Sequence, residues 1–192
     1  MLSPQRNQDA HFSVLQPEDG DVFVDVGAHI GTVAVKAAGI AKDLKFILIE
    51  PESSHYPKLY KNVKDLDFVL VTTAAGDTTS NAMLSVGGSL LENQPLAPQG
   101  PASHIVNIDT LDNILTKVDN PVPNFVKIDT EGYAPNVIRG FTPQPGTKFH
   151  IEYHWNLGPV LNAISLKNIE PIKIELWREF EGSTGAIHAI AR

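Results

Sequence analysis

The sequence predicts an α/β fold with a mainly parallel sheet and helices on both of its faces. Short apolar runs alternate with segments of helical periodicity, which is the pattern of successive βαβ units. The first four runs are almost continuously apolar, as in strands that helices cover on both sides. The last two runs are too close together for a parallel crossover, so we expect the sheet to end in an antiparallel hairpin.

Seven strands are expected, one for each apolar run. They cover residues 22–26, 45–50, 68–74, 124–129, 148–153, 172–177 and 186–191. Residues 172–177 alternate apolar and polar side chains, which indicates an edge or half-exposed strand. A turn near residues 181–183 should close the terminal hairpin.

Helices are expected between these strands. Residues 32–38 are compatible with a helix, and three further stripes have apolar residues at positions i, i+3, i+4 and i+7. The stripes are Tyr56, Leu59, Tyr60 and Val63; Leu111, Ile114, Leu115 and Val118; and Leu157, Val160, Leu161 and Ile164. Ser53 and Thr110 are candidate N-caps, and Pro159 suits a first helical turn. We interpret the stripes as faces that pack on the sheet.

Length and composition indicate a single domain over residues 1–192, with an N-terminal extension over 1–20. The segment 76–105 is rich in Gly and Pro and has few charges, so we expect a lid or acceptor-binding loop, or else a small added hairpin.

Charge and cysteine content exclude several kinds of partner and site. The chain has 15 Lys and Arg against 22 Asp and Glu, a net charge of −7, which disfavours nucleic acid as a partner. Because Cys is absent, disulfides and thiolate sites are impossible. Neither a secretory signal nor an apolar run of membrane length is recognisable, so we expect a cytoplasmic protein without a membrane partner.

The first predicted strand runs into a glycine turn that contains Asp25, Gly27, Ala28, His29 and Gly31. The glycines allow a ligand to approach the backbone, and the following helix presents its N-terminus. The spacing D-x-G-x-x-x-G differs from the G-x-G-x-x-G of dinucleotide-binding turns. A carboxylate at Asp25 would repel a pyrophosphate and suit a cationic sulfonium or ammonium, so the turn favours S-adenosylmethionine over NAD. The alternative is a tight turn in which Asp25 caps the helix. We expect His29 to be a backbone-adjacent contact rather than a base.

Two more acids follow predicted strands. Glu50 ends the second strand of the same βαβ unit, where its carboxylate can accept both hydroxyls of a ribose. The alternative is an exposed strand-end Glu that pairs with a lysine. Asp77 follows the third strand and is a candidate acceptor for an adenine amino group, although Gly-Asp is also a common turn dipeptide.

The fourth and fifth predicted strands end in ionisable residues. Asp129, Glu131, Glu152 and His154 should converge beyond the carboxyl ends of the strands, where open α/β sheets bind ligands. His154 is a candidate general base, the four residues together could bind a divalent metal through oxygen-rich ligands, and a hydrogen-bonded surface histidine is the remaining alternative. Lys127 lies inside a strand on the face of Asp129 and is expected in an internal ion pair. The other histidines show no ligand spacing: His11, His55, His104, His150 and His188.

These motifs resemble, in order and spacing, the FkbM family of S-adenosylmethionine-dependent methyltransferases. The matching blocks are Val24-Asp25-Val26-Gly27-Ala28-His29-Ile30-Gly31, Ile49-Glu50-Pro51, Thr110-Leu111-Asp112, Lys127-Ile128-Asp129-Thr130-Glu131-Gly132 and Ile151-Glu152-Tyr153-His154. The resemblance implies a seven-stranded Rossmann-like class I methyltransferase fold and an O-methylation activity. It also implies that Asp25, Gly27 and Gly31 lie near the methionine end of the cofactor and Glu50 on the ribose. The family usually has Asn in place of His29 and an acid in place of Ala134.

The resulting hypothesis is methyl transfer from S-adenosylmethionine to a hydroxyl of a small-molecule or sugar acceptor. We expect Asp129 beside the methyl group and in contact with the cofactor, His154 or Glu152 as base, and Glu131 as an orienting group, without a metal. A non-catalytic module that binds a nucleoside cofactor or a partner is the alternative, and a nicotinamide oxidoreductase is a third. We also consider a homodimer, because the predicted catalytic core is small.

Overall fold

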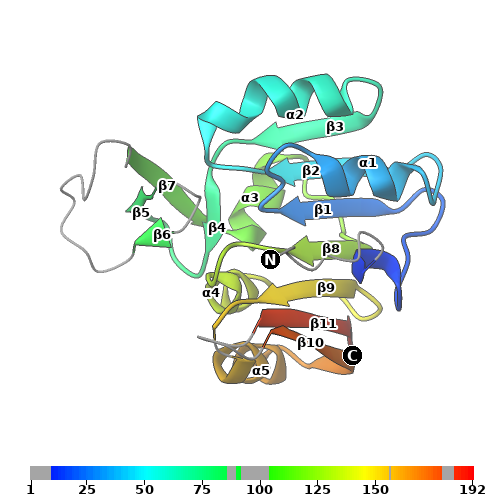
Figure 1. Cartoon of the computed structure of the whole chain (residues 1–192), viewed down its shortest axis with the longest axis vertical. Coiled ribbons are helices and arrows are strands. Elements are labelled where there is room, and N and C mark those ends of the chain that lie inside the picture. The colour runs from blue at the N-terminus through cyan, green and yellow to red at the C-terminus, as the bar shows by residue number, and fades with distance from the viewer. Residues whose placement is uncertain (1–9, 86–89, 92–103, 156, 179–183) are drawn as a thin grey trace, which may run out of the picture.

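A computed structural model describes residues 10–85, 90–91, 104–155, 157–178 and 184–192, and its main feature is a seven-stranded sheet (Figure 1). The strand order is β10-β11-β9-β8-β1-β2-β3. The strands are β1 (Val22–Val26), β2 (Lys45–Ile49), β3 (Asp67–Val71), β8 (Phe125–Ile128), β9 (Lys148–Tyr153), β10 (Ile169–Arg178) and β11 (Thr184–Ala191). Pairing is parallel except around β11, which runs antiparallel to both β9 and β10. The predicted parallel sheet with a terminal antiparallel hairpin is therefore confirmed.

The order in which strands are added to the sheet reverses at β1, which lies between β2 and β8 and is parallel to both. The next strands in sequence, β2 and β3, lie on one side of β1, and the later strands β8 and β9 lie on its other side. The carboxyl ends of β1, β2, β8 and β9 consequently meet at one edge, where an open α/β sheet forms its ligand crevice.

A second, four-stranded sheet lies beyond the carboxyl ends of the parallel strands (Figure 1). Its strands, in the order β4-β7-β5-β6, are β4 (Ala74–Gly76), β5 (Ser80–Leu84), β6 (Leu90–Leu91) and β7 (His104–Thr110). β5 and β6, which are consecutive and lie within the segment 76–105, pair antiparallel, so the added hairpin considered for that segment is present, and β5 also pairs antiparallel with β7. Residues 86–89 and 92–103 of that segment lie outside the described residues.

Helices cover the two faces of the main sheet. They are η1 (Ala10–Phe12), α1 (Thr32–Ala38), η2 (Ser53–His55), α2 (Tyr56–Val63), α3 (Leu111–Lys117), α4 (Ala134–Arg139) and α5 (Leu157–Leu166). Buried side chains of α3, α4 and α5 form one core cluster, and those of α1 and α2, together with Phe12 of η1, form the other. None of the helices in the described ranges is long and apolar enough to cross a membrane.

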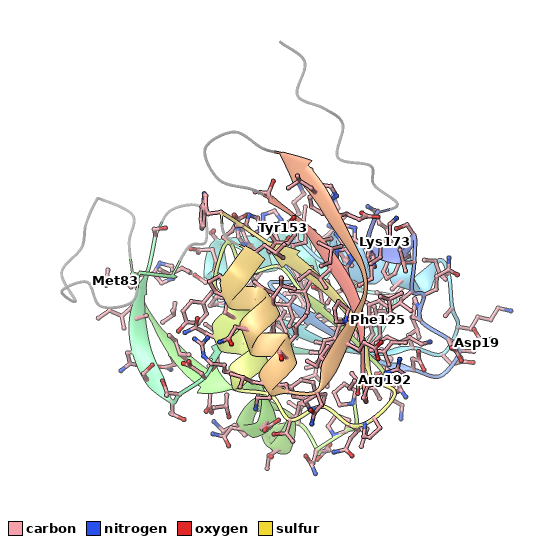
Figure 2. All side chains as sticks on the ribbon, turned by 90° about the horizontal axis from the view of Figure 1, so that it is seen from below. Asp19, Met83, Phe125, Tyr153, Lys173 and Arg192 are labelled. Carbon is pink, nitrogen blue, oxygen red and sulfur yellow. The ribbon has the colours of Figure 1, made fainter. Side chains whose placement is uncertain are left out.

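Stacked aromatic rings fill the core on the side of α1 and α2. The rings of Phe23 and Phe125 lie nearly parallel with centroids 5.0 Å apart, and Phe12 and Phe46 pack around them at 5.6–6.1 Å. Figure 2 shows Phe125 among the packed side chains of the main sheet and Met83 out on the small sheet. The apolar residues of the strands thus form the core that fixes the position of the polar residues at the strand ends.

The predicted strand at 68–74 is wrong in one respect, because the structure divides this run between the two sheets. β3 ends at Val71 and pairs with β2, whereas Ala74 begins β4 and pairs with Ile108 of β7. The three β4 residues are small and buried, and a Cβ on Gly76 would lie 2.6 Å from the Ile108 side chain. This close packing takes the chain out of the main sheet.

The predicted N-caps have different outcomes. The Thr110 hydroxyl accepts a hydrogen bond from the Asn113 N–H at 3.1 Å and caps α3, as expected. Ser53 is not an N-cap, because it starts the 3-10 turn η2, which Glu52 caps by accepting from Ser54. The acid is the better acceptor here, since a carboxylate interacts more strongly with helical N–H groups than a hydroxyl does.

Candidate active site

The glycine turn joins β1 to α1 and is shaped by two left-handed glycines. Gly27 and Gly31 have φ values of 78° and 76°, a region that glycine adopts without strain. A Cβ on Gly27 would lie 1.9 Å from the carbonyl oxygen of Asp129, and a Cβ on Gly31 would lie 2.6 Å from Val63. The glycines thus let the turn pack on the end of β8 and on α2, a requirement that exists before any ligand binds.

Asp25 lies beneath this turn in a buried ion pair. Its side chain is fully buried, and Lys127 Nζ lies 2.9 Å from Asp25 Oδ1 and donates to the carbonyl of Gly27 at 2.8 Å. The alternative that Asp25 caps α1 is wrong, because Gly31 is the N-cap and no side chain caps that helix. Burial raises the pKa of Asp25, and Lys127 opposes this effect. The predicted internal ion pair of Lys127 is confirmed, with Asp25 as its partner.

Glu50 connects the end of β2 to the glycine turn. Its carboxylate accepts from the N–H of His29 at 2.7 Å and from that of Glu52 at 2.9 Å, and it lies 3.2 Å from Nδ1 of His55. The residue is 5% exposed. A carboxylate has about four acceptor positions, so one remains for a ribose hydroxyl and a second is released if His55 turns away. Binding of the ribose by Glu50 therefore stays a prediction.

His29 and His55 lie together beside Glu50. Their rings meet edge to face with centroids 4.2 Å apart, and burial lowers the pKa of His29. His29 contributes its backbone N–H to the Glu50 carboxylate, which agrees with a contact role rather than that of a base.

Asp77 is placed differently from the other predicted cofactor residues. Its carboxylate accepts from Arg139 Nε at 3.0 Å and lies 3.4 Å from Asn136 Nδ2, both on α4. These contacts tie the start of the small sheet to α4. The structure thus supplies Asp77 with a structural partner, and its role as an adenine acceptor stays a prediction.

Asp129, Glu131 and His154 form a cluster beyond the ends of β8 and β9. Nε2 of His154 lies 3.2 Å from Oδ1 of Asp129, and Nδ1 lies 3.5 Å from Oε2 of Glu131. The hydrogen bond to Asp129 raises the pKa of His154, and Glu131 adds to this effect against the opposing influence of burial. The His154 side chain is 8% exposed, so the alternative of a surface histidine is wrong.

Two left-handed residues hold this cluster in place. Glu131 and Gly132 have φ values of 46° and 96°. A Cβ on Gly132 would lie 2.5 Å from the ring of Trp155, which follows His154 directly. The ring therefore packs the β8 loop against the β9 loop, a contact that the sequence analysis did not anticipate although Gly132 and Trp155 both flank predicted residues.

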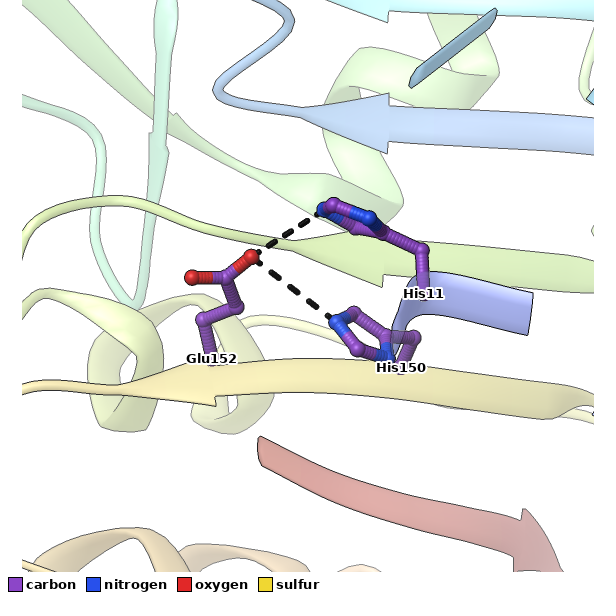
Figure 3. A group of neighbouring side chains, drawn as sticks. All are labelled: His11, His150 and Glu152. Atoms are coloured by element: carbon purple, nitrogen blue, oxygen red, sulfur yellow. Dashed lines mark ion pairs between the residues drawn. The ribbon is translucent and has the colours of Figure 1, made fainter. Parts of the chain in front are cut away.

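Glu152 contacts a second group of side chains, and one of its oxygens also lies within 4.8 Å of ligand atoms of Asp129 and His154. Its Oε1 lies 3.2 Å from Nε2 of His11 and 3.8 Å from Nε2 of His150 (Figure 3). The hydrogen bond from His11 holds the pKa of Glu152 well below its usual range, although burial alone would raise it. Of the two candidate bases, Glu152 is engaged by His11, whereas His154 lies between Asp129 and Glu131, so the geometry favours His154.

The residues at this edge suit S-adenosylmethionine better than a pyrophosphate. Glu50 and Asp129 are carboxylates, whereas Asp25 is fully buried and is bound to Lys127, so neither member of that pair faces the edge. Carboxylates fit a sulfonium, an ammonium and ribose hydroxyls.

A hollow of about 190 Å³ lies between α3 and the segment before β8. It is lined by Asp112, Pro123 and neighbouring residues, none of which was predicted for the site.

Comparison with solved structures agrees with the fold. Precorrin-6y C5,15-methyltransferase from Geobacter metallireducens superposes with a TM-score of 0.62 at 14% identity, covering 100% of this chain and 90% of that one. Fibrillarin from Aeropyrum pernix, crystallised with S-adenosyl-L-methionine, superposes with a TM-score of 0.57 at 12% identity over 90% of this chain and 67% of its own. These similarities confirm the predicted Rossmann-like class I methyltransferase fold.

Sequence comparison identifies the family. The hexuronic acid methyltransferase AglP of Haloferax volcanii is 27% identical over 133 residues, which is 66% of this chain and 52% of that protein. The chain thus spans about half the length of this curated relative. A family model described as the methyltransferase FkbM domain matches residues 25–161. The resemblance drawn from the motifs is confirmed, and the chain belongs to the FkbM family of S-adenosylmethionine-dependent methyltransferases.

Proposed function

We propose that this chain transfers the methyl group of S-adenosylmethionine to a hydroxyl of a small, carbohydrate-like acceptor. The observation that carries the proposal is the position of His154 between Asp129 and Glu131, beyond the carboxyl ends of β8 and β9. Gly27 packs on the carbonyl of Asp129, so this cluster adjoins the glycine turn. The similarity to a hexuronic acid methyltransferase supports a sugar acid as the first acceptor to test.

The cofactor would lie along the ends of β1 and β2. The backbone of Gly27, Ala28, His29 and Gly31 would face its methionine end, and Glu50 would accept a ribose hydroxyl. When bound, S-adenosylmethionine supplies a methyl carbon activated by a sulfonium, and its transfer leaves a neutral thioether. The chain has to orient the acceptor, exclude water and remove one proton, and positioning of this kind can lower a barrier by about 7–11 kcal/mol.

His154 is the proposed base. Its Nδ1 faces Glu131, whose side chain is 43% exposed, so an acceptor hydroxyl can displace that carboxylate. The hydroxyl proton passes to Nδ1 as the oxygen bonds to the methyl carbon. Asp129, at Nε2, stabilises the imidazolium that results, and Glu131 orients the acceptor. The small sheet, which lies on the same side of the molecule, would border the acceptor.

The experiment combines cofactor binding with methyl transfer. Calorimetric titration with S-adenosylhomocysteine and with NAD tests the cofactor, and transfer of labelled methyl to a hexuronic acid or to a neutral hexose tests the acceptor. His154→Gln should lower kcat by about 10²- to 10⁴-fold and leave S-adenosylhomocysteine affinity within about twofold. His104→Gln is the matched control, since it removes a histidine that pairs with Glu52 instead.

The possible outcomes separate the hypotheses. Treatment of the product with mild alkali distinguishes an ether, which is stable, from a methyl ester, which would show that a carboxylate is the acceptor. Binding of S-adenosylhomocysteine without transfer to any sugar would favour the non-catalytic module. Unchanged kcat in His154→Gln would remove His154 from the mechanism, and binding of NAD alone would overturn the cofactor assignment.

A further inference from the structure

A row of ionisable side chains crosses four adjacent strands of the main sheet. In register, Asp25 of β1 pairs with Lys127 of β8, Lys127 with His150 of β9, and His150 with His188 of β11. All four residues are at most 2% exposed. Buried polar groups are costly unless they are paired, so such a row inside an otherwise apolar sheet requires compensation.

The 3-10 turn η1 brings a further histidine to this row. The rings of His11 and His150 lie 4.9 Å apart between centroids and are tilted by 42°. Both rings face Glu152, the residue two positions after His150 on the same face of β9 (Figure 3). One ligand atom from each of His11, His150 and Glu152 lies within 4.8 Å of the other two. The ligands of a tetrahedral zinc ion are about 3.3 Å apart, so the three atoms would move closer together on binding and would leave the fourth position open.

Four buried atoms of this group lack hydrogen-bond partners among the described residues. Both ring nitrogens of His150, Nδ1 of His11 and Oε2 of Glu152 make no hydrogen bond within the described part of the chain. The His150 side chain is 0% exposed and its Nε2 points toward Glu152. Histidine binds a metal through a ring nitrogen whose lone pair is not engaged in a hydrogen bond, so these buried nitrogens are available as ligands.

Charge balance also leaves room for a cation. Lys127 is paired with Asp25, and His154 is paired with Asp129. Glu152 contacts the imidazoles of His11 and His150 and lies near the already paired ammonium of Lys127. A buried carboxylate needs a positive partner, and a bound cation would supply one.

We propose that His11, His150 and Glu152 form a binding site for a divalent transition-metal ion, with Zn²⁺ as the expected occupant. Two imidazoles and one carboxylate are a ligand set used for zinc and, with open positions, for iron(II). The ion would neutralise Glu152 and fasten η1 to β9. The sequence analysis assigned no ligand role to His11 or His150 and expected no metal, so this site is a departure from those expectations.

The test measures metal binding directly, on the full chain without an affinity tag and after treatment with a chelator. We expect calorimetry with ZnCl₂ to show one equivalent bound, and Co²⁺ to give the visible absorption bands of a low-coordinate site. Removing a residue that only hydrogen-bonds to a metal ligand typically lowers metal affinity by about 10- to 100-fold. Removing a ligand itself should cost at least as much, so we expect His11→Gln and His150→Gln each to weaken Zn²⁺ binding at least about tenfold. The control His104→Gln removes a more exposed histidine that pairs with Glu52, and it should bind as the unchanged chain does.

Two results would overturn the proposal: absence of stoichiometric Zn²⁺ binding to the unchanged chain, or equal binding by His11→Gln. His150 is wholly buried, and its replacement could prevent folding, whereas His11 lies on a short turn outside the sheet and is 17% exposed. His11→Gln therefore decides the question, with circular dichroism and S-adenosylhomocysteine binding as checks of the fold. Because the readout is metal binding, its failure would leave the proposed methyl transfer untouched.

Discussion

Replacing Lys127 by Met should strongly destabilise the protein, because it leaves the charge of Asp25 buried without its cation. The two side chains are 3% and 0% exposed and their charged atoms are 2.9 Å apart. With an effective dielectric constant of about 20, two unit charges at this separation attract by about 6 kcal/mol. Removal of one member of a buried pair typically costs about 3–5 kcal/mol, a large part of the roughly 5–15 kcal/mol that holds a domain folded.

The assay is urea unfolding followed by tryptophan fluorescence, with the free energy of unfolding as the measured quantity. We expect Lys127→Met to lose about 3–5 kcal/mol. Adding Asp25→Asn to the same chain removes the orphaned charge at nearly constant volume, so it should recover at least about half of that loss. A cost below about 1 kcal/mol for Lys127→Met, or a double variant no more stable than the single one, would refute this reasoning.

Three other variants test further parts of the structure. Gly27→Ala should cost about 2–4 kcal/mol in urea unfolding, because its Cβ meets the Asp129 carbonyl and its φ is positive; Gly20→Ala, with a positive φ and open space, should cost only about 1 kcal/mol. Lysine and amide hydrogen bonds hold the pKa of Asp109 well below its usual range against the effect of burial. The ionised Asp109 carboxylate therefore contributes its full stabilisation above about pH 4, and this contribution is lost as the pH falls below that value. The melting temperature of Asp109→Asn should consequently change less between pH 2 and 5 than that of the unchanged chain. Glu50→Gln should weaken S-adenosylhomocysteine binding about tenfold or more in calorimetry, and unchanged affinity would exclude Glu50 from the cofactor site.

The strands were predictable where apolar runs end in turn residues. β1 and β9 have the predicted bounds, and Gly27 marks the end of β1 in the sequence. The division of residues 68–74 was not predictable, because Thr72 and Thr73 carry no turn signal and the separation depends on pairing with the distant β7. Local pattern thus identifies a strand, whereas the sheet to which it belongs is decided by long-range packing.

The candidate site was predictable in its members but only partly in its partners. Alternation along β9 already places His150 and Glu152 on one face, and Asp129, Glu131 and His154 meet because the strands that carry them are adjacent and parallel. The ion pair of Lys127 was expected, yet its partner depends on β8 lying beside β1. His11 reaches Glu152 from the other end of the chain, and no local pattern encodes that contact.

The place of β11 inside the sheet, between β9 and β10, constrains the order of assembly during synthesis. β10 emerges from the ribosome before β11, the strand with which it pairs in the sheet, so it can pack on α5 but cannot pair within the sheet until the later strand has been made. We therefore expect β10 and β11 to pair first as a hairpin, which then pairs with β9 as one unit. The nascent chain would carry an open β9 edge until that late event, and this interval is when it would most depend on protection from aggregation.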